Sequence, residues 1–145
     1  MAVKALNPRL TIFQIVALQS FHYVMLGLIF EVNHVFLGSS LSLSCIFSPD
    51  AVKLNSVDGL ADAFALILGQ TINAVLLALI VEKSKRCLDF TITLNFLHLV
   101  NVCLYSGFPA TWDWWIVNIF GMIVMVCLGE WLCSRRELSD IPSLL

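Results

Sequence analysis

The sequence predicts an all-α membrane protein built as a bundle of four transmembrane helices. Of its 145 residues, 59% are hydrophobic and only 12% are charged, and the mean hydropathy is +0.91. Soluble domains carry about 25% charged residues, so the chain is too apolar for that class. The charged residues cluster and leave four charge-free windows: 10–30, 63–81, 90–112 and 114–129.

Each window accounts for one membrane span. A bilayer core of about 30 Å takes roughly 20 helical residues to cross. The first three windows reach that length, and the fourth reaches it if its helix continues through Glu130 to about Cys133. The first window is too long for the apolar core of a cleavable signal, so we expect it to be retained. The expected spans are about 10–31, 60–81, 88–108 and 113–133, in one membrane domain of residues 1–145 with a loop at 32–59 and a tail at 134–145.

The Lys and Arg residues predict the orientation of the bundle. Seven lie on one side of the expected spans: Lys4, Arg9, Lys83, Lys85, Arg86, Arg135 and Arg136. The opposite side carries Lys53 alone. Because short cytosolic loops hold an excess of Lys and Arg, we expect both termini to be cytosolic. The loop at 32–59 then lies on the far side, either along the membrane surface or as a cap on the bundle. The net charge of −2 makes nucleic acid an unsuitable partner.

Polar side chains inside the spans have two interpretations. In the third span Asn95, His98 and Tyr105 follow one helical stripe, with Asn101 beside it, and the other spans add Gln19, His22 and Asn73. Hydrogen bonds between helices are the simpler interpretation, at about 1 kcal/mol or less each. The rival is a pathway for a proton or small solute centred on His22 and His98. No carboxylate lies near the middle of a span, which favours hydrogen bonding.

The remaining charged and sulfur side chains give local expectations. Asp89 should begin the third span and accept backbone N–H bonds there, and Glu130 should pair with Arg86 or Arg135. The five cysteines show no CxxC and no Cys/His metal spacing, so no metal or cofactor is expected. All but Cys45 should be buried thiols, with S-acylation of Cys87 or Cys133 left open. No catalytic motif is present, and we expect no enzyme.

Longer segments of the chain carry a family resemblance. The matching segments are KRCLDFT at 85–91, FLHL at 96–99, YS at 105–106, FP at 108–109, WW at 114–115, GEWLC at 129–133, REL at 136–138 and IP at 141–142, with QIV at 14–16, Gln19, Tyr23 and LG at 26–27 in the first span. Together they resemble the Sys-one family of four-span Golgi integral membrane proteins. The similarity covers most of the chain and is strongest at about 84–142.

The resemblance implies a function at the trans-Golgi network. Family members act there as receptors for an Arf-related small GTPase and support vesicle-mediated protein transport. A GTPase without a strong lipid anchor needs a protein site on the membrane. The expected docking residues are the charged groups of the cytosolic side: Lys83, Lys85, Arg86, Asp89, Glu130, Arg136 and Glu137. The basic members could instead serve only to set topology and bind anionic lipid.

Two further expectations concern the tail and a rival function. Asp140, Leu144 and Leu145 resemble an acidic dileucine sorting signal, a short pattern that also arises by chance. The alternative function is a small four-span proton-coupled transporter, and a membrane-embedded enzyme ranks third. The lipid bilayer is an expected partner for each of these functions, and the formation of a homo-oligomer is left open.

Overall fold

Every regular element in residues 7–38 and 40–140, the part of the chain that the computed structural model describes, is a helix. The elements are α1 (Pro8–Leu37), α2 (Ser44–Phe47), the 3-10 turn η1 (Pro49–Ala51), α3 (Val57–Ile80), α4 (Ser84–Ser106) and α5 (Trp112–Ser139). Four of them, α1, α3, α4 and α5, are long and apolar enough to cross a membrane. The predicted all-α, four-span fold is therefore confirmed.

The helix ends follow local sequence chemistry, and several differ from the expected spans. Asn7 caps α1 through its side-chain oxygen, and the next residue, Pro8, suits the first helical position. The helix passes residue 31 and ends at Gly38, whose φ of 67° favours glycine. Likewise α4 begins at Ser84 rather than 88, and α5 runs through part of the expected tail to Ser139. The membrane boundaries within these helices stay predictions.

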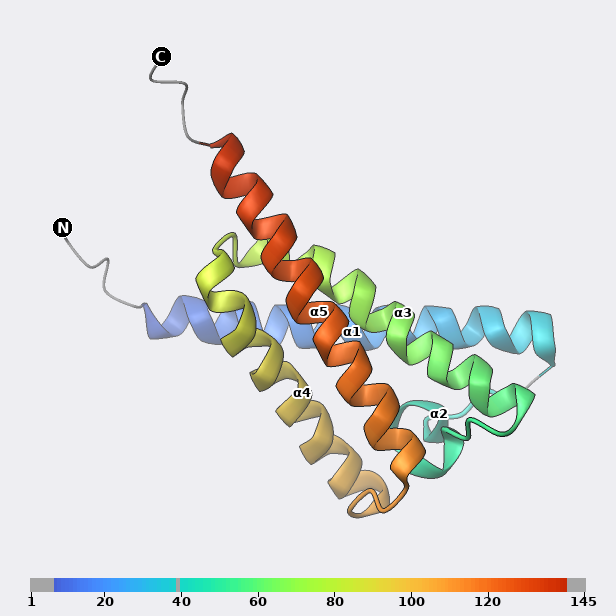
Figure 1. Ribbon diagram of the computed structural model, residues 1–145. Coiled ribbons are helices and arrows are strands. Elements are labelled where there is room, and N and C mark those ends of the chain that lie inside the picture. The colour runs from blue at the N-terminus through green and yellow to red at the C-terminus, as the bar shows by residue number, and fades with distance from the viewer. Residues whose placement is uncertain (1–6, 39, 141–145) are drawn as a thin grey trace.

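The helix α3 lies at the centre of the bundle, with α5 and α1 packed against it (Figure 1). Half of the most apolar window of α3 is buried within the protein, whereas only 17% of the corresponding window of α1 is buried. Small residues on α5 allow the close approach: a Cβ at Gly121 would lie 2.9 Å from the Gln70 side chain, and one at Gly129 would lie 2.9 Å from Leu77. In Figure 1, α1 crosses behind the other three spans at a steep angle.

Long-range hydrogen bonds bring four helix ends together. Gln14 near the start of α1 donates to the Ile80 carbonyl at the end of α3, at 2.9 Å. Arg136 near the end of α5 donates to the Ala78 carbonyl at 2.8 Å, and Glu137, also on α5, accepts hydrogen bonds from Ser84 at the start of α4. We call this end of the bundle the basic end. The described Lys and Arg residues other than Lys53 lie toward it, and Lys4 lies outside the described residues. That the basic end faces the cytosol stays a prediction.

The core consists of two apolar clusters with a polar layer between them. The cluster toward the basic end contains Leu18, Ala74, Leu77, Ala78, Val81, Cys87, Phe90, Leu94, Met125 and Cys133. The other contains Leu26, Phe30, Val52, Ala63, Ala65, Leu66, Val102, Trp114 and Val117. Along α1, α3 and α4, the buried residues His22, Gln70 and His98 fall between members of the two clusters.

The connection between α1 and α3 caps the opposite end of the bundle. The Phe47 ring of α2 lies 5.2 Å from the Tyr23 ring and 5.8 Å from the Tyr105 ring. The Asp113 carboxylate at the start of α5 accepts the Leu54 backbone N–H at 3.1 Å. Of the two arrangements that the sequence left open for this segment, these contacts favour the cap.

Candidate docking surface at the basic end

The α3–α4 turn presents the basic side chains. Lys83 and Lys85 are exposed, and Arg86 is half-buried. Across residues 7–38 and 40–140, the one ion pair joins Arg136 to Glu82, so these three cations make none. Glu82 forms the corner of the turn with a φ of 62°, a conformation that costs a non-glycine residue about 1–2 kcal/mol. The turn is therefore a constrained element, and its positive charges are not used within the fold.

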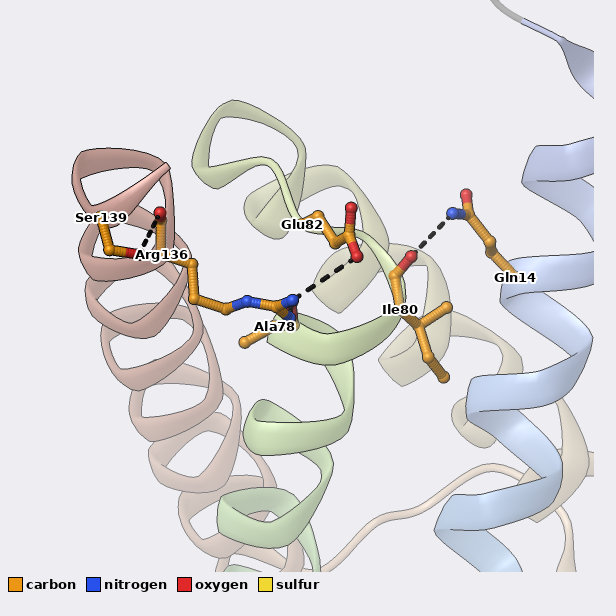
Figure 2. Close-up of polar contacts among 6 residues, drawn as sticks. All are labelled: Gln14, Ala78, Ile80, Glu82, Arg136 and Ser139. Atoms are coloured by element: carbon orange, nitrogen blue, oxygen red, sulfur yellow. Dashed lines mark hydrogen bonds and ion pairs between the residues drawn. The ribbon is translucent and has the colours of Figure 1, made fainter. Parts of the chain in front are cut away.

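The Arg136 side chain fastens α5 to the end of α3, as Figure 2 shows. One guanidinium nitrogen donates to the Ala78 carbonyl at 2.8 Å, and the other lies 3.6 Å from the Glu82 carboxylate. Carbonyls in the last turn of a helix have no partner within the helix, and their partial negative charge attracts a cation. The side chain remains 42% exposed, so part of it is accessible to a partner.

Glu137 caps α4 from a different helix. Its two carboxylate oxygens accept hydrogen bonds from the Ser84 hydroxyl at 2.8 Å and the Ser84 backbone N–H at 3.3 Å. The residue at the N-cap position of α4, Lys83, provides no side-chain cap of its own. A carboxylate is the favourable group there, because the first N–H groups of a helix lack internal partners and carry partial positive charge.

Two sequence expectations at this end were wrong. Asp89 does not begin the helix, because α4 starts at Ser84 and places Asp89 in its second turn with an exposed side chain. Glu130 pairs with neither Arg86 nor Arg135. The Arg135 guanidinium instead lies over the Trp131 ring, 5.0 Å from its centroid. Asp89 and Glu130 are thus exposed carboxylates without an ion-pair partner among the described residues.

The polar residues of the spans form contacts between helices. The Tyr23 hydroxyl on α1 accepts from the Asn101 amide at 2.8 Å and lies 3.3 Å from the His98 ring nitrogen, both on α4. Gln70 on α3 donates to Asn95 on α4 at 2.9 Å. These bonds support the interhelical role.

The other predicted polar positions differ in burial. His22 and Asn73 are buried, and Gln19 is half-buried. The His22 ring meets the His98 ring edge-on, with centroids 6.2 Å apart. Tyr105, the last member of the helical stripe in the third span, is exposed and contacts Phe47.

The cysteines differ in burial, and only part of the tail lies in the described residues. Cys87 and Cys133 are buried, but the burial expected of Cys103 and Cys127 was wrong, since one is half-buried and the other is exposed. No three metal-binding side chains come together in the described part of the chain. Asp140 is exposed just past α5, and Leu144 and Leu145 lie outside the described residues.

Sequence reasoning missed Glu82 and Ser84 as structural partners. Gln14 is one of the polar residues expected to bond between helices, but its partner could not be named, because the Ile80 carbonyl is 66 residues away along the chain. The partner of Ser84 is 53 residues away. The available signal was the absence of a capping side chain at Lys83, which leaves the first N–H groups of α4 in need of an acceptor.

Four apolar helices joined at one end by polar bonds define a multi-pass integral membrane protein. Residues 1–143 match the SYS1 family, described as integral membrane protein S linking to the trans Golgi network. The chain belongs to this family, and is thus a multi-pass integral membrane protein of the Golgi. No solved structure matches the chain.

Curated relatives come from distant organisms. The chain is 38% identical to the Protein SYS1 homolog of Dictyostelium discoideum over 95% of its own length and 60% of that protein. It is 37% identical to the homolog of Nematostella vectensis over 93% of the chain and 86% of that protein. Protein SYS1 of Saccharomyces cerevisiae is 28% identical over 94% of the chain and 68% of that protein. The chain therefore spans less than two thirds of the Dictyostelium relative.

Proposed function

We propose that this protein is a Golgi membrane receptor that recruits an Arf-related small GTPase to the trans-Golgi and supports vesicle-mediated protein transport. The basic end then faces the cytosol. One observation carries the proposal: Lys83, Lys85 and Arg86 lie within four consecutive residues at that end, and none has an ion-pair partner in the described residues. Membership of a family linked to the trans-Golgi network supports it.

The seven expected docking residues divide into two groups under this proposal. Arg136 and Glu137 fasten the α3–α4 turn from α5, so they position the surface as well as border it. Lys83, Lys85 and Arg86, with the carboxylates of Asp89 and Glu130, present charges that the fold itself does not use. A partner with complementary groups gains from these charges in rate of association and in specificity.

Anionic lipid is the competing ligand for the basic side chains. Each Lys or Arg near a negative membrane surface gains about 1 kcal/mol from it. Asp89 and Glu130 gain nothing there, because they carry the same sign of charge as the lipid. A docking surface that carries both signs of charge suits a folded protein partner better than it suits a uniformly anionic membrane.

The transporter alternative is less well supported by the core. A proton path through His22 and His98 would have to continue toward both ends of the bundle. An apolar cluster lies on each side of the polar layer, one containing Leu18 and Leu77 and the other Leu26 and Leu66. The interhelical bonds of Tyr23 with Asn101 and His98 account for the polar layer as a structural feature.

Replacement of the three free cations tests the docking surface. The variant Lys83→Ala, Lys85→Ala, Arg86→Ala, expressed in place of the native chain, should lose most of the GTPase from Golgi membranes, measured by membrane fractionation. Lys53→Ala is the matched control, since this exposed lysine lies on the loop at the opposite end. Unchanged recruitment in the triple variant would exclude this surface as the docking site.

A second experiment tests the function without reference to particular residues. A proximity-labelling enzyme fused to the C-terminal tail should biotinylate an Arf-related small GTPase more strongly than the same enzyme on an unrelated four-span Golgi protein does. Equal labelling by both fusions would count against the receptor function itself. Because the fusion retains the native surface, its failure is distinguishable from failure of the proposed docking residues.

A further inference from the structure

Two free thiols touch each other between α4 and α5. The Cys87 and Cys133 sulfur atoms are 3.2 Å apart, and both residues are completely buried. Cys87 also donates its S–H to the Lys83 carbonyl at 3.6 Å. Apolar packing alone does not require sulfur at two facing positions, whereas a pair in contact can be oxidised with little movement of the helices.

A pair of hydrogen bonds lies beside the thiols on the side of the basic end. Ser84 is one helical turn before Cys87, and Glu137 is one turn after Cys133. The Ser84–Glu137 hydrogen bonds, which we call the clasp, therefore join the same two helices next to the sulfur pair. A reagent from the aqueous phase at this end reaches the sulfurs only when the two helix ends separate.

We propose that Cys87 and Cys133 form a redox-sensitive modification site: an intramolecular disulfide between α4 and α5, formed by peroxide and controlled by opening of the clasp. The proposal goes beyond GTPase recruitment and does not depend on it. The fully buried positions also make S-acylation of either thiol incompatible with the closed clasp, because an acyl chain has no space at 0% exposure.

The chemistry is a two-electron oxidation. One thiol loses its proton, the thiolate attacks a hydrogen peroxide oxygen, and the O–O bond breaks to give a sulfenic acid and a hydroxide, which takes up that proton as water. The second sulfur then attacks the sulfenic sulfur, the S–S bond forms, and the S–O bond breaks. The departing hydroxide takes the proton of the second thiol and leaves as water. In sum, two thiols and one peroxide give a disulfide and two water molecules, and a reducing thiol such as glutathione reverses the oxidation.

Peroxide treatment of the purified full-length chain in lipid vesicles tests the disulfide. Peptide mass mapping should recover the peptides of Cys87 and Cys133 cross-linked within one chain. A variant with Cys45, Cys103 and Cys127 replaced by serine should still lose two alkylatable thiols and remain monomeric on a non-reducing gel. Two results would overturn the proposal. One is that both thiols stay free at peroxide levels that oxidise a small-molecule dithiol completely, and the other is that cross-links form only between chains.

The role of the clasp has its own variant and control. Glu137→Ala should raise the rate of oxidation about tenfold, because losing hydrogen bonds to a charged group increases the population of the open state by roughly that factor. Asp140→Ala removes an exposed carboxylate less than one turn further along and should leave the rate unchanged. Equal rates in the wild type and Glu137→Ala would show that the clasp does not control access.

Discussion

The attachment of α5 to the end of α3 leads to a quantitative prediction about Arg136. Its guanidinium donates a charge-assisted hydrogen bond to the Ala78 carbonyl and lies at ion-pair distance from Glu82. A hydrogen bond to a charged group contributes about 1.5–3 kcal/mol. The ion pair contributes less than about 1 kcal/mol, because its two side chains are 42% and 64% exposed. The carbonyl bond should therefore account for most of the stabilisation by Arg136.

Two substitutions separate these contributions. Arg136→Ala removes both and should cost about 2 kcal/mol, a fall of about 4–8 °C in Tm for a chain of this size. Glu82→Gly removes only the ion pair. It also relieves about 1 kcal/mol of backbone strain at a φ of 62°, partly offset by the greater freedom of glycine in the unfolded chain. Glu82→Gly should therefore change the free energy of unfolding by less than about 0.5 kcal/mol in either direction, since the exposed ion pair that it removes contributes little.

Thermal unfolding in detergent micelles measures both variants. In a chain with Cys45, Cys103 and Cys127 replaced by serine, a fluorophore that reacts with thiols reports the exposure of Cys87 and Cys133, which are buried at the same end of the bundle. Arg136→Lys should give an intermediate Tm, since an ammonium group can replace one donor but not the planar fork. If Glu82→Gly lowered the Tm as much as Arg136→Ala, the ion pair would dominate and the reasoning from the carbonyl bond would be refuted.

Three further predictions concern the spans and the topology. Tyr23→Phe removes the hydroxyl shared by two α4 side chains and should destabilise the bundle by about 1 kcal/mol; an unchanged Tm would argue against a structural role for this hydroxyl. Gly69→Val should cost about 1–3 kcal/mol, because a Cβ there lies 2.5 Å from Leu26, whereas Gly27→Val meets nothing within 4 Å and should be tolerated; equal losses would contradict this packing. An Asn-X-Thr acceptor inserted at 53–56 should be glycosylated, and one inserted at 82–83 should not. Gel mobility before and after glycosidase treatment measures both, and the reverse pattern would show that the predicted orientation is wrong.

The spans could be predicted from sequence because the signal is local and strong. A charged side chain inside a bilayer is costly, so charge-free windows mark the segments that cross it. The ends of the helices depend on weaker signals that compete with each other. Asn7 and Pro8 start α1 early, and Gly38 rather than Glu31 ends it, because one exposed acidic residue does not stop a helix while a glycine at positive φ often does.

The side-chain pairs at the basic end could not be predicted in the same way. Glu130 and Arg135 are five residues apart on α5, and helical neighbours are three or four apart. Arg135 accordingly lies over Trp131, which is four residues before it. Arg136 and Glu137 bond to groups 58 and 53 residues away, so their partners depend on how three helices pack.

The partners of the charged residues suggest how the fold and the proposed function share one surface. Orphan backbone groups at the ends of α3 and α4 require a cation and an anion, and Arg136 and Glu137 supply them from α5. Once these needs are met, further charges at the same end add little to stability, because exposed ion pairs contribute less than about 1 kcal/mol. Lys83 and Lys85 are therefore free to change with little effect on folding. Variants at these two positions should alter recruitment without altering Tm, whereas variants at Arg136 should alter both, since the turn that carries the lysines is held in place from α5.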